Sequence, residues 1–436
     1  FIGIGSLILA KHPALHSLAE VTIIGMFSVV LMAYIFPPLI YGWLVRIKGQ
    51  YRRRPLSLCP LLLMLTSTTV FFLQLLTVHI IGFVLFVLFH PTERSKSFFH
   101  RYVHHLFRFD IKHIPSVRFH FKNLTNENFC IPSLLISNHQ SMLDAAVFMA
   151  ISPKILLIAN ENASLNWVIK KVFEWLDFIT ISEEYPINLE LLKIYQAKGY
   201  SFVIFPEGER NATSSILRFH KGAFYIAEQL GLDIIPVLLH GLNEILPRNS
   251  MAVFSGTITV KVNNRIKSSD ISWGKGYLER TKKFHRYYVE EYHALTASIE
   301  NAQYFSRLVQ DRYLYKGVDV TRTVSKNLSR YDNYSQWIDK PIETGHVIVL
   351  NNGFGEFTLL YALVHPNVMV VAVEADEAVA TLAQYSAIGL VGNVQTVSSV
   401  DHPSVQKLIG NAKVFLLHPS EEDKSFFSKY HPTIID

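Results

Sequence analysis

A histidine and a carboxylate with the spacing of a base and its partner follow an apolar stretch near the middle of the chain. Asn138 and His139 end the run LLISNH, and Asp144 comes five residues after the histidine. On one helix, five residues would place the two side chains roughly 140° apart, so they would not meet. With His139 in a strand-to-helix loop and Asp144 in the first helical turn, the carboxylate can reach one ring nitrogen. That contact fixes the tautomer and leaves the other nitrogen as a general base.

A second polar cluster adds weight to the first. PEGER, residues 206–210, follows the apolar run SFVIF, and Lys221 comes later in the same region. Arg binds a phosphate or carboxylate through its planar fork, and Lys adds a point charge. A His–Asp pair by itself is more often structural than catalytic. Beside Arg210 and Lys221, the pair indicates a site where an anionic substrate meets a base.

Short apolar runs alternate with helical patterns in this part of the chain. We expect strands at residues 117–121, 133–137, 178–182, 201–205 and 233–241, and helices at 144–151, 166–176, 189–200 and 221–232. This alternation predicts an α/β fold with a mostly parallel sheet. Ligand sites in such sheets lie at the carboxyl ends of strands, and both polar clusters fall there.

The order of four motifs resembles the glycerolipid acyltransferase family, the 1-acylglycerol-3-phosphate and lysophospholipid acyltransferases. The motifs are Asn138-His139 with Asp144, Phe205-Pro206-Glu207-Gly208 with Arg210, Lys221-Gly222, and Ile235-Pro236-Val237. The resemblance implies a membrane-bound enzyme of phospholipid metabolism that moves an acyl chain from acyl-coenzyme A or acyl-carrier protein to a lysolipid hydroxyl. His139 is then the catalytic base, and Asp144 orients it.

The same resemblance assigns the acceptor site. Glu207, Gly208 and Arg210 shape it, and Arg210 holds the anionic group of the acceptor, with Lys221 as a second candidate for that role. Glu207 is equally open to a purely structural hydrogen-bonding role. The resemblance implies no metal and no cofactor for acyl transfer. No acyl-enzyme is needed either, because no Ser or Cys lies in a nucleophile elbow.

One segment departs from the family pattern. The family usually has a basic residue after the strand at 178–181, where this chain has Ser182, Glu183 and Glu184. Two acids repel a phosphate. We therefore expect an acceptor that carries a positive group, such as an aminoacyl or sphingoid-like lipid, rather than lysophosphatidic acid.

Composition indicates a membrane protein. Charged residues make up 17% of the chain, against about 25% in ordinary soluble domains. The net charge of +6 suits an anionic membrane surface or an acidic acyl carrier, and no aromatic-interleaved nucleic-acid motif is visible. The two cysteines form neither a disulfide framework nor a metal set. We expect membrane lipids and an acyl carrier as partners, and no nucleic acid.

Two apolar segments are long enough to enter a bilayer. Residues 21–45 carry no charged residue and suit one spanning helix, and residues 55–92 have no Asp, Glu, Lys or Arg. Because basic residues flank the second segment on both sides, we expect a membrane hairpin broken near residues 66–69 or near Gly82, or a re-entrant dip. A very hydrophobic pair of core helices is the alternative. The basic flanks predict the inner (cytoplasmic) membrane, with the soluble parts facing the cytoplasm. Residues 97–109 predict a helix at the lipid interface.

Residues 1–45 resemble the last two membrane helices of exporters of the resistance-nodulation-division class. The glycine-rich start, the run KHPALHSL and the Pro near the end of the last helix carry this resemblance. It implies that an exporter portion of the same polypeptide precedes these residues.

The C-terminal part changes to a new strand–glycine loop–helix–strand pattern. Gly353 and Gly355 would let the backbone approach a ligand, and Glu374 ends the next strand, where a carboxylate can hold ribose hydroxyls. The pattern resembles the start of a class I S-adenosylmethionine-dependent methyltransferase, which implies that cofactor. Asn351 replaces the acid that the family has before the glycines. A degenerate Rossmann-like module that only packs is therefore an alternative.

These patterns divide the chain into four parts. We expect exporter-like transmembrane helices at 1–54, a membrane hairpin at 55–97, an α/β acyltransferase domain at 98–300, and a linker with a partial Rossmann-like, methyltransferase-like domain at 301–436. The main prediction is lipid O-acyl transfer. The alternatives are a fragment of a lipid transporter with regulatory soluble domains, or a methyltransferase as the main activity.

Overall fold

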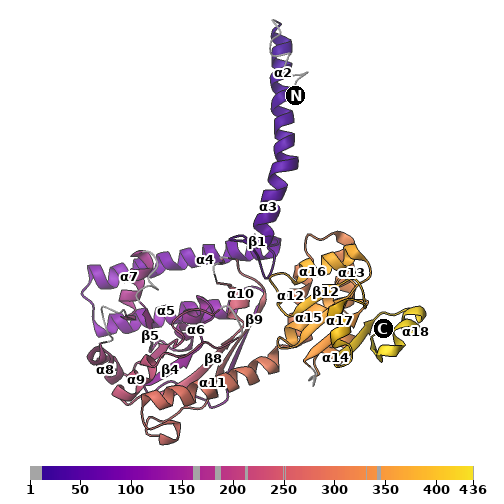
Figure 1. Cartoon of the computed structure of the whole chain (residues 1–436). Helices are drawn as coiled ribbons and strands as arrows, with labels where there is room; N and C mark the ends of the chain where they lie inside the picture. The colour runs from indigo at the N-terminus through magenta and orange to yellow at the C-terminus, as the bar shows by residue number, and fades with distance from the viewer. Residues whose placement is uncertain are drawn as a thin grey trace. The chain divides into compact units, whose positions relative to one another are not determined.

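The structure is a computed structural model that describes residues 12–160, 167–181, 188–211, 215–248, 250, 252–329, 331–340 and 345–435. The chain forms two compact units. Residues 58–298 make one unit, and residues 1–57 together with 299–436 make the other. The labels of Figure 1 are used throughout.

The unit at 58–298 is an α/β unit. Its helices are α4 (Leu58–Phe83), continued by the π-helical turn η3 (Val84–Leu88), α5 (Glu93–His113), α6 (Leu143–Ile151), α7 (Trp167–Trp175), α8 (Leu189–Ala197), α9 (Gly222–Leu230), α10 (Leu242–Ile245), the short η5 (Ile271–Trp273) and α11 (Tyr277–Ile299). Its strands are β3 (Val117–Asn123), β4 (Ser133–Ser137), β5 (Ile155–Asn160), β6 (Ile179–Ile181), β7 (Ser201–Ile204), β8 (Asp233–His240) and β9 (Gly256–Val262).

The sheet of this unit has the order β3-β9-β8-β4-β7-β5-β6. All neighbours run parallel except β8 and β9, which are antiparallel. In the register of β4 and β7, Ile136 lies opposite Ile204. The carboxyl ends of β4 and β7 are therefore side by side, as the sequence predicts for the two polar clusters.

The middle of the sheet is buried on both faces. Every residue of β4 and of β7 is buried, which is typical of parallel strands covered by helices. Phe148 of α6, Val203 and Leu239 are fully buried in one hydrophobic cluster. The carboxyl ends of the central strands therefore emerge from a rigid core, which holds the loops after them in place.

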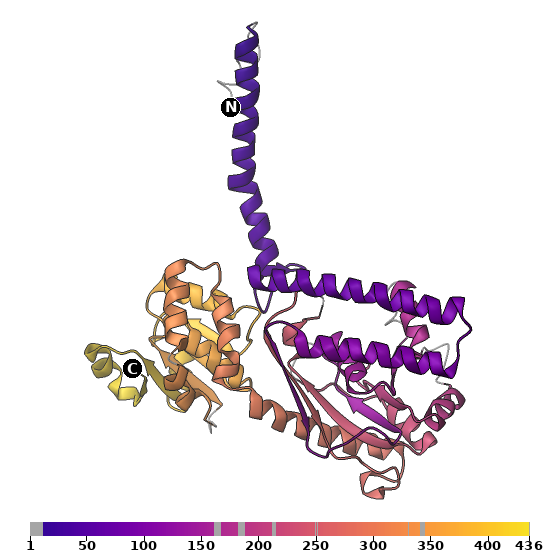
Figure 2. The same cartoon turned by 180° about the vertical axis from the view of Figure 1, so that it is seen from behind.

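The segment expected to be a membrane hairpin is one continuous helix. α4 passes through residues 66–69 without a break, and the hydroxyls of Thr66 and Thr69 donate to the carbonyls of Leu62 and Leu65 one turn earlier. α4 also lies along its own unit: in both Figure 1 and Figure 2 it runs beside α5. The expected break and re-entrant dip are therefore replaced by a helix that packs lengthwise.

Gly82 serves close packing rather than a break in α4. A Cβ atom at this position would lie 2.4 Å from Cε3 of Trp175 in α7, so only glycine lets the two helices approach. Polar contacts repeat along the same side of α4. Gln74 donates to Asp110 of α5 at 2.7 Å, and the hydroxyl of Tyr102 donates to Thr77 at 2.7 Å.

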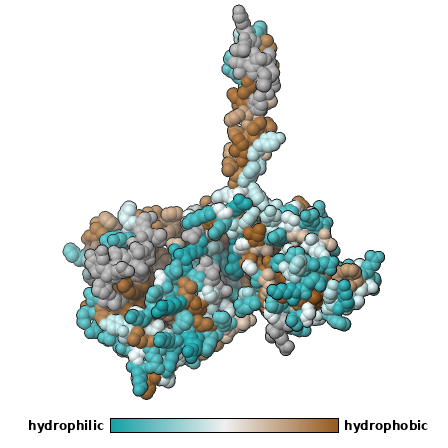
Figure 3. Space-filling model, viewed as in Figure 1, coloured by the Kyte–Doolittle hydropathy of each residue, from teal (hydrophilic) through white to brown (hydrophobic). Residues whose placement is uncertain are grey.

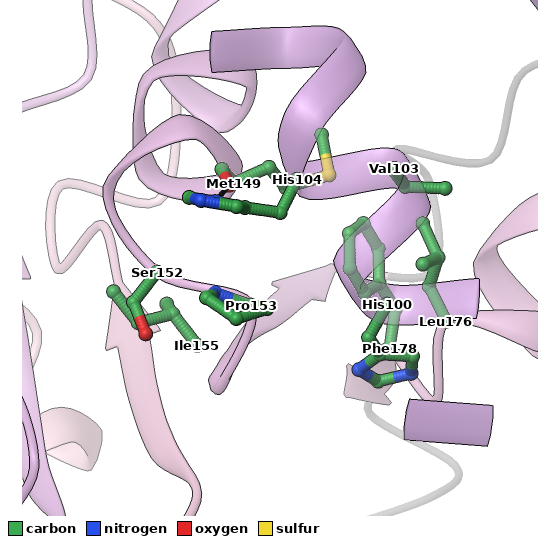
Figure 4. A pocket seen from close by; sticks show the side chains of 9 residues that line it. All are labelled: His100, Val103, His104, Met149, Ser152, Pro153, Ile155, Leu176 and Phe178. Carbon is green, nitrogen blue, oxygen red and sulfur yellow. Dashed lines mark hydrogen bonds between the residues drawn. The ribbon is translucent and has the colours of Figure 1, made fainter. Parts of the chain in front are cut away.

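α5 forms as predicted, and two of its histidines are buried within the unit. His100 and His104 are 5% and 7% exposed, and they line a small cavity of about 10 Å³ shown in Figure 4. A volume of this size holds about one water molecule. Nδ1 of His104 lies 2.8 Å from the carbonyl oxygen of Met149 in α6. His104 therefore belongs to the packing between α5 and α6, whereas His100 lies 3.6 Å from Asp177, just after α7.

The first part of the other unit is a long apolar helix. It comprises α2 (Pro13–Val30), the π-helical turn η2 (Leu31–Ile35) and α3 (Phe36–Val45), followed by the hairpin of β1 (Arg46–Ile47) and β2 (Gln50–Tyr51). Many of its large apolar side chains are exposed, and Figure 3 shows them along the helix. By length and composition, the helices at 13–45 and 58–88 are each able to cross a membrane.

The second part of this unit is a Rossmann-like arrangement. Its elements are α12 (Ala302–Arg312), α13 (Val318–Ser329), α14 (Tyr331–Ile338), β10 (His346–Leu350), α15 (Glu356–Val364), β11 (Met369–Val373), α16 (Glu377–Ala387), β12 (Val394–Val397), α17 (Pro403–Leu408), β13 (Lys413–Leu417), α18 (Glu421–Phe427), the short η6 (Ser428–Tyr430) and β14 (Thr433–Ile435). The sheet order is β12-β11-β10-β13-β14, and every neighbouring pair is parallel. The predicted alternation of strands and helices is thus confirmed in this part of the chain.

Candidate active site

Asn138 anchors the end of β4 to the neighbouring strand. Its side-chain amide donates to the carbonyl of Leu239 and accepts from the amide of the same residue, each at 2.9 Å. The hydroxyl of Tyr288, from α11, lies 2.9 Å from both the backbone nitrogen and Oδ1 of Asn138. Both side chains are buried. The residue before the histidine is therefore held rigidly by partners more than 100 positions away in the chain.

His139 and Asp144 form the contact that their spacing predicts. Nδ1 of His139 lies 2.7 Å from Oδ2 of Asp144, which is in the first turn of α6. The same oxygen accepts from the backbone amides of Gln140 at 2.6 Å and Ser141 at 3.0 Å. Asp144 is fully buried, so its carboxylate is confined to this loop. A carboxylate that accepts from Nδ1 leaves Nε2 as the proton acceptor.

The free edge of the imidazole is accessible. The His139 side chain is 23% exposed, and within the described parts of the chain no hydrogen bond engages its Nε2. The ring stacks on Phe205, with centroids 4.3 Å apart and planes 17° apart. Phe205 directly follows β7, so a second strand end sets the ring's orientation. The sequence places Phe205 in a motif, but it does not reveal this stacking.

Glu207 ties two loops together. Its Oε1 accepts from the backbone amide of His139, and its Oε2 accepts from that of Leu217, both at 3.0 Å. Burial raises the pKa of the Glu207 carboxyl, and the two backbone hydrogen bonds oppose that effect. Both carboxylate oxygens bind backbone groups. Of the two roles open from the sequence, these contacts favour the structural one.

Replacing Glu207 by glutamine is expected to destabilise the unit by about 1–3 kcal/mol, because the new amide NH₂ would face a backbone N–H and leave it unsatisfied. Denaturant unfolding of the purified protein would measure the loss. Glu190→Gln is the matched control, since the Glu190 side chain is 79% exposed on α8. Equal stability of the two variants would contradict the structural role.

Gly208 makes the turn after Glu207 possible. Its φ of +76° lies in the left-handed region, and a Cβ there would approach Nε2 of His220 to 3.2 Å. The amide of His220 in turn donates to the carbonyl of Pro206 at 2.7 Å. Gly208 therefore contributes to the site by allowing the tight turn of the loop.

Arg210 lies next to the histidine loop. The amide of the following residue, Asn211, donates to the carbonyl of His139 at 2.7 Å. Among the residues that the structure describes, no hydrogen bond or ion pair engages the Arg210 guanidinium. Arg248, which the sequence analysis missed, donates to the Arg210 carbonyl at 2.6 Å and lies 3.5 Å from Glu209. The backbone at Arg210 is thus held while its charge stays available to a ligand.

Lys221 precedes the first residue of α9 and is exposed. Its neighbour His220 is bonded to the PEGER loop, so Lys221 belongs to the same rim of the sheet. Ser182, Glu183 and Glu184, the basis of the acceptor prediction, lie outside the described residues.

The glycine turn of the C-terminal part binds its own acid. Gly353 and Gly355 both have positive φ, and the amide of Gly353 donates to Oε2 of Glu374 at 2.7 Å. Oε1 of Glu374 accepts from the amide of Asp376 at 3.1 Å. The carboxylate predicted to hold a ribose therefore binds two backbone amides of its own unit. Each carboxylate oxygen keeps a further lone pair, so ribose binding by Glu374 stays a prediction beside the alternative of a module that only packs.

Comparison with known proteins agrees with the central motifs. Residues 116–240 match the family model described as Acyltransferase. The match supports an acyltransferase domain in this part of the chain. The match agrees with the family expected from the four motifs for these residues, and the wider boundaries at 98 and 300 stay predictions.

Curated relatives carry the same family name. The chain is 27% identical to the chloroplastic 1-acyl-sn-glycerol-3-phosphate acyltransferase LPAT1 of Arabidopsis thaliana, over 45% of this chain and 55% of that protein. It is 32% identical to the 1-acyl-sn-glycerol-3-phosphate acyltransferase of Cocos nucifera, over 37% and 52%. For the human beta form the values are 27% identity over 37% and 60%. The chain therefore spans a little more than half the length of these relatives.

A solved structure is similar as well. The 1-acyl-sn-glycerophosphate acyltransferase PlsC of Thermotoga maritima is 17% identical, with a TM-score of 0.46, over 55% of this chain and 96% of that chain.

Proposed function

We propose that the acyltransferase domain transfers an acyl chain from acyl-coenzyme A or acyl-carrier protein to a lipid hydroxyl, with His139 as general base. The contact between Nδ1 of His139 and the buried carboxylate of Asp144 supports this proposal most directly. Nε2 accepts the hydroxyl proton as the hydroxyl oxygen bonds to the thioester carbonyl carbon. The C–S bond then breaks, and the imidazolium returns the proton to the leaving thiolate.

Direct transfer agrees with the position of the nearest cysteine. Cys130 precedes β4, whereas His139 follows that strand, so the two lie at opposite ends of it. A strand of five residues spans about 17 Å at ~3.3 Å per residue, which is far beyond hydrogen-bond reach. Cys130 therefore does not pair with the base, and no acyl-enzyme is invoked.

The charged residues of this region indicate which kind of acceptor lipid would bind. The relatives are named for 1-acyl-sn-glycerol-3-phosphate, whose phosphate would suit the Arg210 guanidinium, which no described residue engages. Glu183 and Glu184 stand in the sequence where the family usually has a basic residue, and two acids disfavour a phosphate and favour an acceptor with a positive group. We propose that Arg210 binds a carboxylate or a single phosphate on a lysolipid that also carries an amine.

Arg210→Ala is expected to lower catalytic efficiency about tenfold to over a hundredfold, because a charge-assisted contact of roughly 1.5–3 kcal/mol is lost. Arg210→Lys should recover only part, since lysine lacks the fork. Steady-state kinetics with the purified protein measure the change. Arg322→Ala is the control, because that side chain is 76% exposed on α13.

A competition assay tests the acceptor class. The purified protein receives equal amounts of a lysophosphatidic acid and an amine-bearing lysolipid, with one acyl donor. Preference for the amine-bearing lipid, reversed by Glu183→Arg with Glu184→Arg, is expected. Strong preference for lysophosphatidic acid by the unmodified protein would instead restore the substrate for which the relatives are named.

Membrane attachment is part of the proposal. Two helices have the length and apolar composition of membrane segments, and their large apolar side chains are extensively exposed. An acyltransferase that acts on lysolipids needs its base near the lipid–water boundary. We propose the inner membrane, with the acyltransferase domain on the cytoplasmic side where acyl carriers are found. The exporter-like and methyltransferase-like assignments stay predictions. A regulatory role for the soluble parts would not require the His139–Asp144 contact.

A further inference from the structure

The unit formed by 1–57 and 299–436 contains a cleft of about 410 Å³. Tyr41 of α3 and Tyr51 of β2 line it from one side, and Ala378 and Tyr385 of α16 from another. Arg312 and Lys316, at and after the end of α12, contribute the only charges among the residues of its lining. Gly353, Gly355 and Glu374 do not line it.

Arg312 is a buried cation that binds carbonyls rather than a carboxylate. Its side chain donates to the backbone carbonyl of Ser386 at 3.0 Å and to that of Arg52 at 2.6 Å, and it also bonds the carbonyl of Ile388. The residue is only 4% exposed, and burial lowers the pKa of its guanidinium. The neighbouring Asp311 pairs instead with Arg54 at 2.7 Å. The described residues thus supply no acidic partner for Arg312.

Lys316 adds a second cation to the same cleft. Its ammonium group donates to the hydroxyl of Ser386 and lies 5.3 Å from the centre of the Tyr313 ring. Burial, together with the charge of Arg312, lowers the pKa of Lys316 to about 7. No ion pair to a carboxylate is found for it among the described residues. Burying two cations without a counter-ion costs free energy, and an anion bound between them would lower that cost.

The rest of the lining is mainly apolar and aromatic. Val45, Leu314 and Leu382 complete the walls beside the tyrosine rings. The cleft also lies at the end of α3, whose Phe36, Leu39, Ile40 and Trp43 side chains are exposed. An anion with an apolar chain could therefore place its charge at the two cations and its chain along α3. A free inorganic anion would leave these apolar walls unused.

We propose that this cleft binds the acidic head group of a membrane lipid. Arg312 and Lys316 contact its phosphate or carboxylate oxygens, and the tyrosines and α3 cover the start of its acyl chains. Such a site is separate from the acyltransferase domain. The lipid would be bound as a ligand and would not be consumed there.

Native mass spectrometry of the full chain in detergent tests the site. The protein is titrated separately with short-chain phosphatidic acid, with phosphatidylcholine of the same chain length, and with inorganic phosphate. Phosphatidic acid should bind at least about tenfold more tightly than phosphatidylcholine, because its phosphomonoester carries more negative charge and has no choline cation beside it to repel Arg312 and Lys316.

Two variants locate the binding. Lys316→Met should weaken phosphatidic acid binding about tenfold or more, whereas Lys326→Met, at an exposed position on α13, should not. Ala378→Trp should block the cleft, and because Ala378 is exposed the unit should still fold. Circular dichroism checks that folding. Equal binding of the two lipids, or unchanged binding by both Lys316→Met and Ala378→Trp, would overturn the proposal. Inorganic phosphate binding as tightly as the lipid would also overturn it, in favour of a simple anion site.

Discussion

His139→Ala should lower the rate of acyl transfer by about 10²–10⁴-fold while the protein still folds, because a general base typically contributes that much. Among the described residues, the His139 side chain makes a hydrogen bond to Asp144 and stacks on Phe205, so few contacts are lost when it is removed. The backbone hydrogen bonds of residue 139, to Glu207 and from Asn211, survive the change. Initial rates with a fixed acyl donor and lysolipid measure the loss, and thermal unfolding confirms the fold.

The matched control for this variant is His120→Ala. His120 is an exposed histidine on β3 of the same sheet. That variant should keep its turnover. If His139→Ala retained near-normal turnover, the general-base mechanism would be wrong, and the His139–Asp144 contact would be a structural pair.

Asp144→Asn should also cost about 10²–10⁴-fold in kcat, with KM for both substrates nearly unchanged. Oδ2 of Asp144 accepts from Nδ1 of His139 and from two backbone amides, so its charge both orients the ring and stabilises the imidazolium that forms during transfer. Asparagine keeps the shape but removes the charge. Because Asp144 acts through His139, it is a positioning residue.

A double variant separates positioning from a merely structural role. When two residues act as one unit, the second change adds little to the first. His139→Ala with Asp144→Asn should therefore be about as slow as His139→Ala alone. Asp319→Asn, whose side chain is 96% exposed, is the control. If the rate loss of the double variant equalled the product of the two single losses, Asp144 would not act through the histidine. A change in KM with kcat preserved would show the same.

Local spacing determined much of this site. His139 and Asp144 are separated by one short loop, so a strand before them and a helix after them are enough to bring imidazole and carboxylate together. The periodicity of apolar residues predicted the strands at 133–137 and 201–205, and neighbouring parallel strands place their carboxyl ends at one edge. The C-terminal strand–helix alternation followed from the same rule.

The tertiary structure decided which side chains support the site and how the apolar helices lie. Phe205 stacks on His139, Glu207 bonds to its amide, and Tyr288 holds Asn138, all across 66 or more positions of sequence. The sequence suggested a break near Gly82 in a membrane segment, but in the structure the ring of Trp175 packs against this glycine. The contact of Glu374 with the Gly353 amide could not be inferred from the sequence either. Apolar periodicity and motif spacing encode local geometry. The partner of a glycine, a ring or a carboxylate depends on which distant segment packs beside it, and only the folded chain specifies that.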